Sequence, residues 1–92
     1  MQVFHLRTRF LYMETPEQVS RGISHNISEA LAKAGISQRA AADLTGIPLT
    51  TLSRRLTGAA PFLVTELAVL AKVLNTTVSA LTTDQAEADE VA

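Results

Sequence analysis

The side chains between residues 49 and 55 define the clearest chemistry in this chain. The segment reads LTTLSRR, so it combines two threonines, a serine and two arginines. Hydroxyl groups both donate and accept hydrogen bonds, while an arginine guanidinium offers a planar fork of donors to a pair of acceptors. Such side chains suit recognition of a surface with fixed acceptors. The chain has no nucleophile-elbow, triad-like or glycine-rich phosphate-loop pattern, so we expect no catalytic residues and no enzyme activity.

Helical geometry would place most of these side chains on one outward face. Each residue of a helix advances by about 100°, so if Leu52 points inward then Leu56 also faces the core. Thr50 and Arg54 then lie about 160° from Leu52, on the outer surface. The flanks and rim of that surface consist of the remaining residues of the segment, Leu49, Thr51, Ser53 and Arg55.

An outward face of this composition fits the edges of DNA base pairs. Arginine is the commonest side chain for bidentate hydrogen bonds to guanine O6 and N7, and threonine can bond a base edge or contact a thymine methyl group. We therefore expect Thr50 and Arg54 to read bases and Arg55 to meet a phosphate. Leu49 could contact a thymine or be partly buried. The alternative is an ordinary solvated helix surface, which this segment alone does not exclude.

The preceding segment predicts the element that would project this face. In SQRAAADLTG, Gln38, Ala42 and Gly46 are four residues apart. A small residue is needed where two helices cross closely, and glycine takes the left-handed backbone of a sharp turn at little cost. We therefore predict a helix-turn-helix over residues 37–57.

The start of this motif could also bind phosphate. Ser37, Gln38 and Arg39 lie where the free N–H groups of a helix point outward, and such an end attracts an anion. Gln38 could instead cap the helix, and the two roles are compatible.

Composition limits the other possibilities. The 92 residues suit one domain, cysteine is absent, and no apolar run is long enough for a membrane span. His5 and His25 have no neighbouring third ligand, so we expect no metal. We also expect no cofactor and no small-molecule substrate. Residues 1–58 carry seven cationic against four anionic side chains, whereas residues 59–92 carry one against five. The weakly basic half is thus the one that contains the predicted DNA-reading face. We expect a cytoplasmic protein.

Capping and periodicity predict an all-α fold of five helices. Thr15-Pro16 is a strong helix start, Gly35 ends the first helix, and Pro48 opens the third. The expected apolar stripes are Val19, Ile23, Ile27, Ala30, Leu31 and Ala34 in the first helix, and Leu63, Leu67, Leu70, Ala71 and Leu74 in the fourth, which Asn75 ends. The fifth helix is predicted at residues 77–81. Residues 1–14 would form an N-terminal arm or β-strand, residues 15–82 the helical domain, and residues 83–92 an acidic, disordered tail.

The motifs together resemble the Cro/CI-like (XRE-type) family of helix-turn-helix repressors. The similarity spans residues 23–81 and is carried by SQRAAADLTG, IPLTTLSRRLTG and LAVLAKVLNTTVSAL. It implies a compact, lambda-repressor-like five-helix bundle that binds operator DNA as a dimer, with the third helix in the major groove. By position, Leu49, Thr50 and Arg54 match base-reading places and Gln38 matches a phosphate contact.

Two features depart from the family pattern. Residues 57–61 are neutral where members often carry basic residues, so phosphate contacts there would have to come from backbone N–H groups. The N-terminal segment is an addition, which could be a dimer element or, through Arg7 and Arg9, a basic arm on DNA.

The fourth helix is apolar nearly all round, with Phe62, Val69 and Val73 beside its leucines. Either the N-terminal segment or a second subunit is expected to cover it.

The sequence therefore predicts a transcriptional regulator that binds double-stranded DNA sequence-specifically. The favoured form is a phage repressor or Cro-like homodimer on a near-palindromic operator. One alternative is the antitoxin of a toxin–antitoxin pair, which uses the same fold. Another is a helix-turn-helix that serves only as a protein-interaction module.

Overall fold

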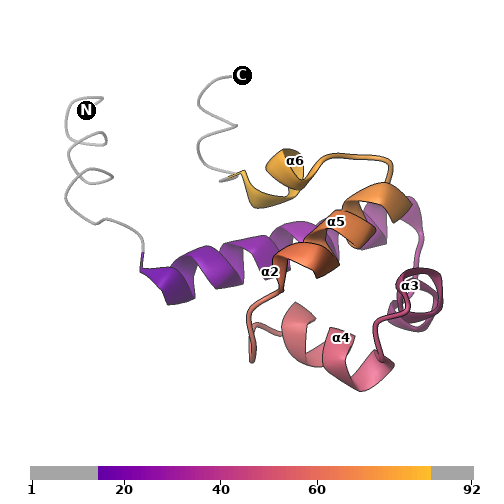
Figure 1. Cartoon of the computed structure of the whole chain (residues 1–92), viewed down its shortest axis with the longest axis horizontal. Helices are drawn as coiled ribbons and strands as arrows, with labels where there is room; N and C mark the ends of the chain where they lie inside the picture. Colours follow the sequence, from indigo (N-terminus) through magenta and orange to yellow (C-terminus); the bar gives the residue numbers. More distant parts are fainter. Residues whose placement is uncertain (1–14, 84–92) are drawn as a thin grey trace.

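A computed structural model describes residues 15–83, which form five α-helices and no strand (Figure 1). The helices are α2 (Pro16–Ala34), α3 (Gln38–Thr45), α4 (Leu49–Leu56), α5 (Val64–Val73) and α6 (Val78–Thr82). The all-α, five-helix prediction is confirmed for this part of the chain. The predicted arm or strand at residues 1–14 and the acidic tail from residue 84 onward lie outside the described residues.

The long helix α2 is the support on which α4 and α6 pack. It begins with a capping box, in which the Thr15 hydroxyl accepts from the Gln18 N–H (3.1 Å) and the Gln18 side chain accepts from the Thr15 N–H (2.9 Å). Its buried face consists of Ser24, Ile27 and Leu31. The predicted stripe was too long at both ends, because Val19 and Ala34 are exposed.

The turn between α3 and α4 has the predicted construction. Ala42 is buried, and α3 packs on α4. Gly46 follows with φ of 80°, and its N–H donates to the Ala42 carbonyl (2.9 Å). The Thr45 hydroxyl adds a link, since it donates to Ala41 and accepts from the Ile47 N–H. These bonds fix the direction in which α4 leaves the turn.

Two glycine substitutions are expected to change stability in opposite directions. A Cβ at Gly46 would meet no atom within 4 Å, but the left-handed backbone makes Gly46→Ala cost about 1–2 kcal/mol. Gly22 is exposed within α2 and also has open space around it, so Gly22→Ala should stabilise by about 0.5–1 kcal/mol. Denaturant unfolding of both variants measures the two effects. Equal shifts of the same sign would contradict the strain assigned to the turn.

The helices α5 and α6 complete the core. Leu70 is fully buried and Leu67 and Ala71 nearly so, but Leu63 is 54% exposed and precedes α5 as its cap residue. The prediction that Leu63 faces the core was therefore wrong, since it lies outside the helical register. Asn75 follows Leu74, the C-cap residue of α5, and has φ of 56°, as expected for a residue that tolerates the left-handed region. The buried hydrophobic residues are Ile27, Leu31, Ala41, Ala42, Ile47, Leu52, Leu67, Leu70, Ala71 and Leu81.

The last helix is tied to α2 by a side chain. The Asn26 amide donates to the Leu81 carbonyl (3.0 Å) and to the Thr83 carbonyl (2.8 Å). It thereby satisfies carbonyl groups at the end of α6 that have no partner within the helix. Thr83, which the sequence assigned to the tail, is thus held against the helical domain.

Candidate nucleic-acid interface

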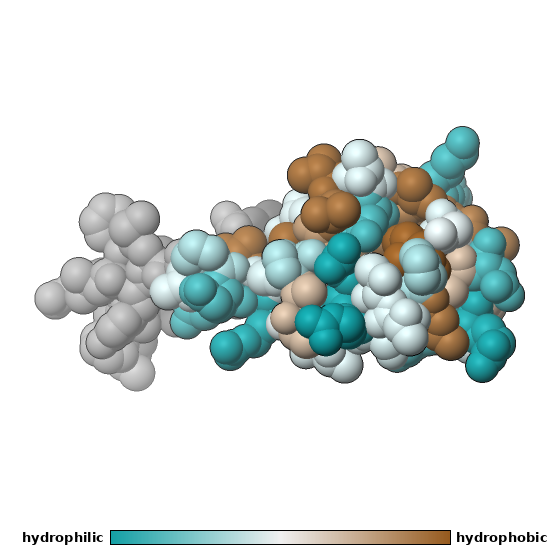
Figure 2. All heavy atoms as spheres, turned by 60° about the horizontal axis from the view of Figure 1, so that its bottom comes forward, coloured by the Kyte–Doolittle hydropathy of each residue, from teal (hydrophilic) through white to brown (hydrophobic). Residues whose placement is uncertain are grey.

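The outward face of α4 has the composition that the sequence predicted. Leu52 is completely buried, while Thr50 and Arg54 on the opposite side are exposed. Thr51 and Ser53 are half-buried at its flanks. Figure 2 turns the side of the molecule with α3 and α4 toward the viewer, and the middle of this face is mostly hydrophilic or neutral, with apolar side chains gathered toward its upper and right parts. A row of hydrogen-bonding groups is therefore open to an extended ligand.

A hydrogen bond joins this face to the start of α3. The Ser53 hydroxyl donates to the Gln38 side-chain oxygen over 2.9 Å. The amide nitrogen of Gln38 has no acceptor among residues 15–83, so both of its N–H groups are available to a ligand. The bond also fixes the N-terminus of α3 beside the middle of α4, so that the two predicted contact regions form one surface.

The N-terminus of α3 carries free donors. Ser37 caps the helix by accepting from the Ala40 N–H (3.1 Å), so its hydroxyl is partly used within the chain. Within residues 15–83 the backbone N–H groups of Gln38 and Arg39 have no acceptor. Both side chains are exposed. Free N–H groups and a cationic side chain at a helix start suit a phosphate group.

Arg55 lies apart from the other predicted site residues. Its Nε is 2.8 Å from Glu66 Oε1 and its second guanidinium nitrogen is 3.2 Å from Oε2, a two-bond pair between α4 and α5. The two side chains are only 18% and 13% exposed. The Arg55 carbonyl also accepts from the buried Ser24 hydroxyl of α2 (2.6 Å). Arg55 therefore joins α4 to α2 and to α5. Leu49 is half-buried and packs against the core.

The partners of Arg55 were not predicted from the sequence. Ser24 occurs within the apolar stripe of α2, and a serine in such a stripe is a signal for a buried hydrogen bond. Glu66 is also the cap of α5, since its carboxylate accepts from the Leu63 N–H (2.9 Å). The sequence gives no comparable signal for the pairing of Glu66 with Arg55, because this pairing depends on the turn between α4 and α5.

The Arg55–Glu66 pair makes stability depend on pH. The hydrogen bond from Arg55 lowers the pKa of Glu66 from its ordinary value of 4.5, assisted by the Leu63 N–H and opposed by burial. The same hydrogen bond raises the pKa of Arg55. Since the folded state holds the Glu66 carboxylate ionised more strongly than the unfolded chain does, its contribution to stability is complete above about pH 4.5 and is lost as the pH falls through the lowered pKa.

We expect Glu66→Gln to lower the melting temperature at neutral pH, with the difference from the unmutated protein shrinking below about pH 4.5. Thermal unfolding followed by circular dichroism across this range measures it. Glu29→Gln is the matched control: Glu29 forms an exposed pair with His25 (3.1 Å), so its effect should be small. A Glu66→Gln difference that stays constant down to about pH 3 would contradict the role of this carboxylate.

The loop after α4 does not have the free backbone donors that the sequence analysis expected. The Thr57, Gly58 and Ala59 N–H groups donate to the carbonyls of Ser53, Arg55 and Arg54, respectively. Of residues 57–60, Ala60 alone has an N–H without an acceptor among the described residues. The prediction that the backbone of this loop supplies the phosphate contacts was therefore wrong for three of these residues, because their N–H groups close the C-terminus of α4.

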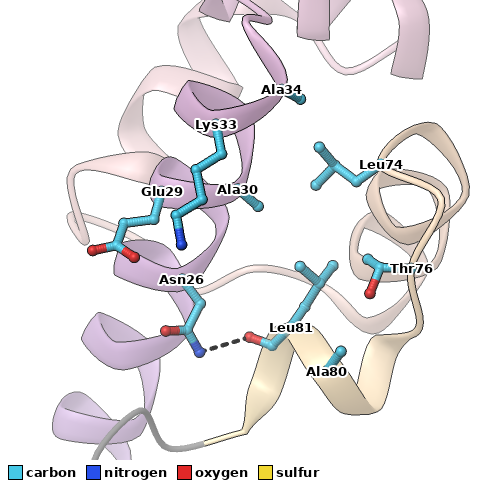
Figure 3. Close-up of a pocket in the computed structure, with 9 residues that line it drawn as sticks. All are labelled: Asn26, Glu29, Ala30, Lys33, Ala34, Leu74, Thr76, Ala80 and Leu81. Atoms are coloured by element: carbon cyan, nitrogen blue, oxygen red, sulfur yellow. Dashed lines mark hydrogen bonds between the residues drawn. The ribbon is translucent and has the colours of Figure 1, made fainter.

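A groove lies where α2 meets α6 and the connection between α5 and α6. Figure 3 shows this groove of about 450 Å³ between α2 and the α5–α6 connection, with the Lys33 and Glu29 side chains on one wall and Leu74 and Thr76 on the other. The Asn26 amide is engaged by its hydrogen bond to the Leu81 carbonyl.

No group of three metal-ligating side chains occurs within residues 15–83, and none of the helices described there has the length and apolarity of a membrane span.

The order of helices, the tight α3–α4 turn and the exposed polar face of α4 define a helix-turn-helix protein. Comparison with protein families agrees: a model described as helix-turn-helix matches residues 27–81, more than half of the chain. The chain belongs to this helix-turn-helix family, in agreement with the Cro/CI-like (XRE) resemblance of the sequence. No curated protein and no solved structure matches the chain. Membership supports a DNA-binding regulator.

Proposed function

We propose that this protein is a transcriptional repressor that reads an operator with the outer face of α4 in the major groove. The observation that carries the proposal is the joined surface of α3 and α4, in which Gln38 and Ser53 are hydrogen-bonded and Thr50 and Arg54 project outward. An α-helix fits the major groove, where each base pair presents a distinct set of acceptors and donors.

Arg54 is the principal base-reading side chain in this proposal. It is exposed, and among residues 15–83 its guanidinium has no hydrogen-bonded or ion-paired partner, so its donors are available for guanine O6 and N7. Thr50 lies one turn earlier on the same face and would bond a base edge or contact a thymine methyl. Thr51, Ser53 and Leu49 line the sides of the same helix.

The start of α3 would hold the DNA backbone. The contact would use the free N–H groups of Gln38 and Arg39, the amide nitrogen of Gln38 and the Arg39 guanidinium, with Ser37 fixing the helix end. Such contacts set the register and orientation of a protein on the duplex without reading sequence. Arg55 is left out of this set, since its guanidinium is held by Glu66; it positions α4 instead.

A homodimer accounts for the remaining apolar surface. Leu63, Val64 and Val69 at α5 are 54%, 75% and 38% exposed, and a second subunit or residues 1–14 would cover them. In a two-fold dimer the two α4 helices would lie about 34 Å apart on one side of the DNA, which requires a near-palindromic site. We place this repressor in the cytoplasm of a bacterium or of a phage-infected cell.

The experiment that tests DNA binding is a salt titration of the affinity for duplex DNA. If phosphates are contacted, the logarithm of the association constant should fall linearly with the logarithm of the salt concentration, by about 0.9 per phosphate. A helix-turn-helix that only binds proteins would show no such binding, and that result would overturn the proposal. Sizing the complex by light scattering gives its stoichiometry, with two subunits per site expected.

A further inference from the structure

The loop between α4 and α5 leaves one side of the proposed DNA-reading helix without an obvious phosphate anchor. A helix in the major groove, about 12 Å wide, has a phosphate backbone on each side. The N-terminus of α3 supplies donors to one of these. On the other side, residues 57–61 carry no charge and three of the loop's N–H groups are used within the chain. The loop itself therefore offers no charged side chain to a phosphate on this side.

Arg21 of α2 lies against this loop. A Cβ built on Gly58 would be 3.5 Å from the Arg21 Cγ, so the aliphatic part of the arginine packs over the glycine. Gly58 has φ of 86° and follows the last turn of α4 directly, so the contact lies at the C-terminal end of the reading helix. Arg21 is exposed, and no carboxylate among residues 15–83 forms an ion pair with it.

The same region is hollowed. Arg21 and Gly58 line a groove of about 300 Å³ together with Pro16, Glu17, Ser20, Ala59 and Pro61. A long cationic side chain with its stem on one wall can move its head within such a space to meet a phosphate. Glu17 is the opposing feature, because it lines the groove one turn before Arg21 and would repel the same phosphate.

We propose that Arg21 is a phosphate-binding residue that clamps the DNA backbone beside the C-terminal end of α4, in place of the basic residues that the following loop lacks. This inference rests on the proposed function and adds a residue of α2 to the DNA-binding surface. Arg39 at α3 and Arg21 at α2 would then hold backbone on the two sides of the groove that α4 enters. Arg21 contributes affinity without choosing the sequence, since phosphates carry none.

The test compares salt slopes of variants on one duplex that contains the site preferred by the unmutated protein. Arg21→Ala should reduce the slope by about 0.9, so that its affinity deficit shrinks by about 3.5-fold between 50 and 200 mM salt. Arg21→Gln should reduce the salt slope by the same amount as Arg21→Ala, while its aliphatic stem still packs over Gly58. This variant therefore separates loss of the charge from loss of packing. Base preference should be unchanged in both variants.

Two further variants serve as controls. Lys33→Ala removes one positive charge from the same helix, but Lys33 lies in the groove beside α6 and its loss should leave the slope unchanged. Glu17→Gln should raise the affinity at low salt. An unchanged slope in Arg21→Gln, with normal binding by the unmutated protein, would overturn the assignment of Arg21. Absence of salt-dependent binding by the unmutated protein would instead overturn the proposed function.

Discussion

Arg54→Ala is expected to weaken binding to the preferred DNA site by about 1–3 kcal/mol, or roughly 5- to 140-fold. The reason is the loss of a bidentate contact from an exposed guanidinium that has no partner in the described part of the chain. The loss should relax the preference at one base pair of each half-site and leave the other positions unchanged. Measuring affinities for a panel of single-base variants of the site gives both quantities.

Two substitutions control for this result. Arg54→Lys keeps the charge but removes the planar fork, so it should lose most of the base preference while retaining more of the affinity than the alanine variant. Arg39→Ala removes a cation at the α3 N-terminus and should weaken all sequences about equally. Unaltered affinity and preference in Arg54→Ala would contradict the role of this side chain in readout.

Leu52→Ala is expected to destabilise the fold by about 2–5 kcal/mol, which is a large fraction of the stability of a small domain. Leu52 is completely buried and is the side chain by which α4 enters the core. Truncation would leave a cavity beneath the helix, so we expect DNA affinity to fall through unfolding and loosening of α4. Equilibrium denaturation with urea measures the stability change.

Leu44→Ala is the matched control for this prediction. Leu44 is 59% exposed in α3, so the same truncation should change stability by at most about 0.5 kcal/mol. Similar effects at both positions would contradict the orientation of α3 and α4 described above.

Local signals were sufficient for most of the fold. The Thr15 side chain caps α2 by a local hydrogen bond, and Gly46 and Asn75 take a left-handed backbone that few other residues accept, so these helix boundaries followed from the sequence. Leu63 shows where this reasoning fails. Its spacing from Leu67 continues the apolar stripe, but it precedes the helix, and a residue outside the helix does not obey helical periodicity.

The candidate site was predictable only in the part that one helix defines. The outward positions of Thr50 and Arg54 follow from the burial of Leu52, which needs only the helical repeat. Arg55 required more. Whether an arginine at the rim of a helix meets a phosphate or a carboxylate depends on the neighbouring helix, and here Glu66 of α5 lies within 2.8 Å. The packing of Arg21 on Gly58 likewise depends on how α2 meets a loop 37 positions further along the chain.

Selection of duplexes from a random DNA pool, followed by sequencing and sizing of the complex, tests the central claim most directly. The proposed readout by α4 predicts enrichment of one near-palindromic motif whose half-sites are centred about one helical turn apart, roughly 34 Å, with two subunits bound. Repeating the selection with Arg54→Ala should blur one position in each half-site. Recovery of a random pool, or of a motif that Arg54→Ala leaves unchanged, would contradict the account of this protein as a sequence-reading DNA-binding regulator.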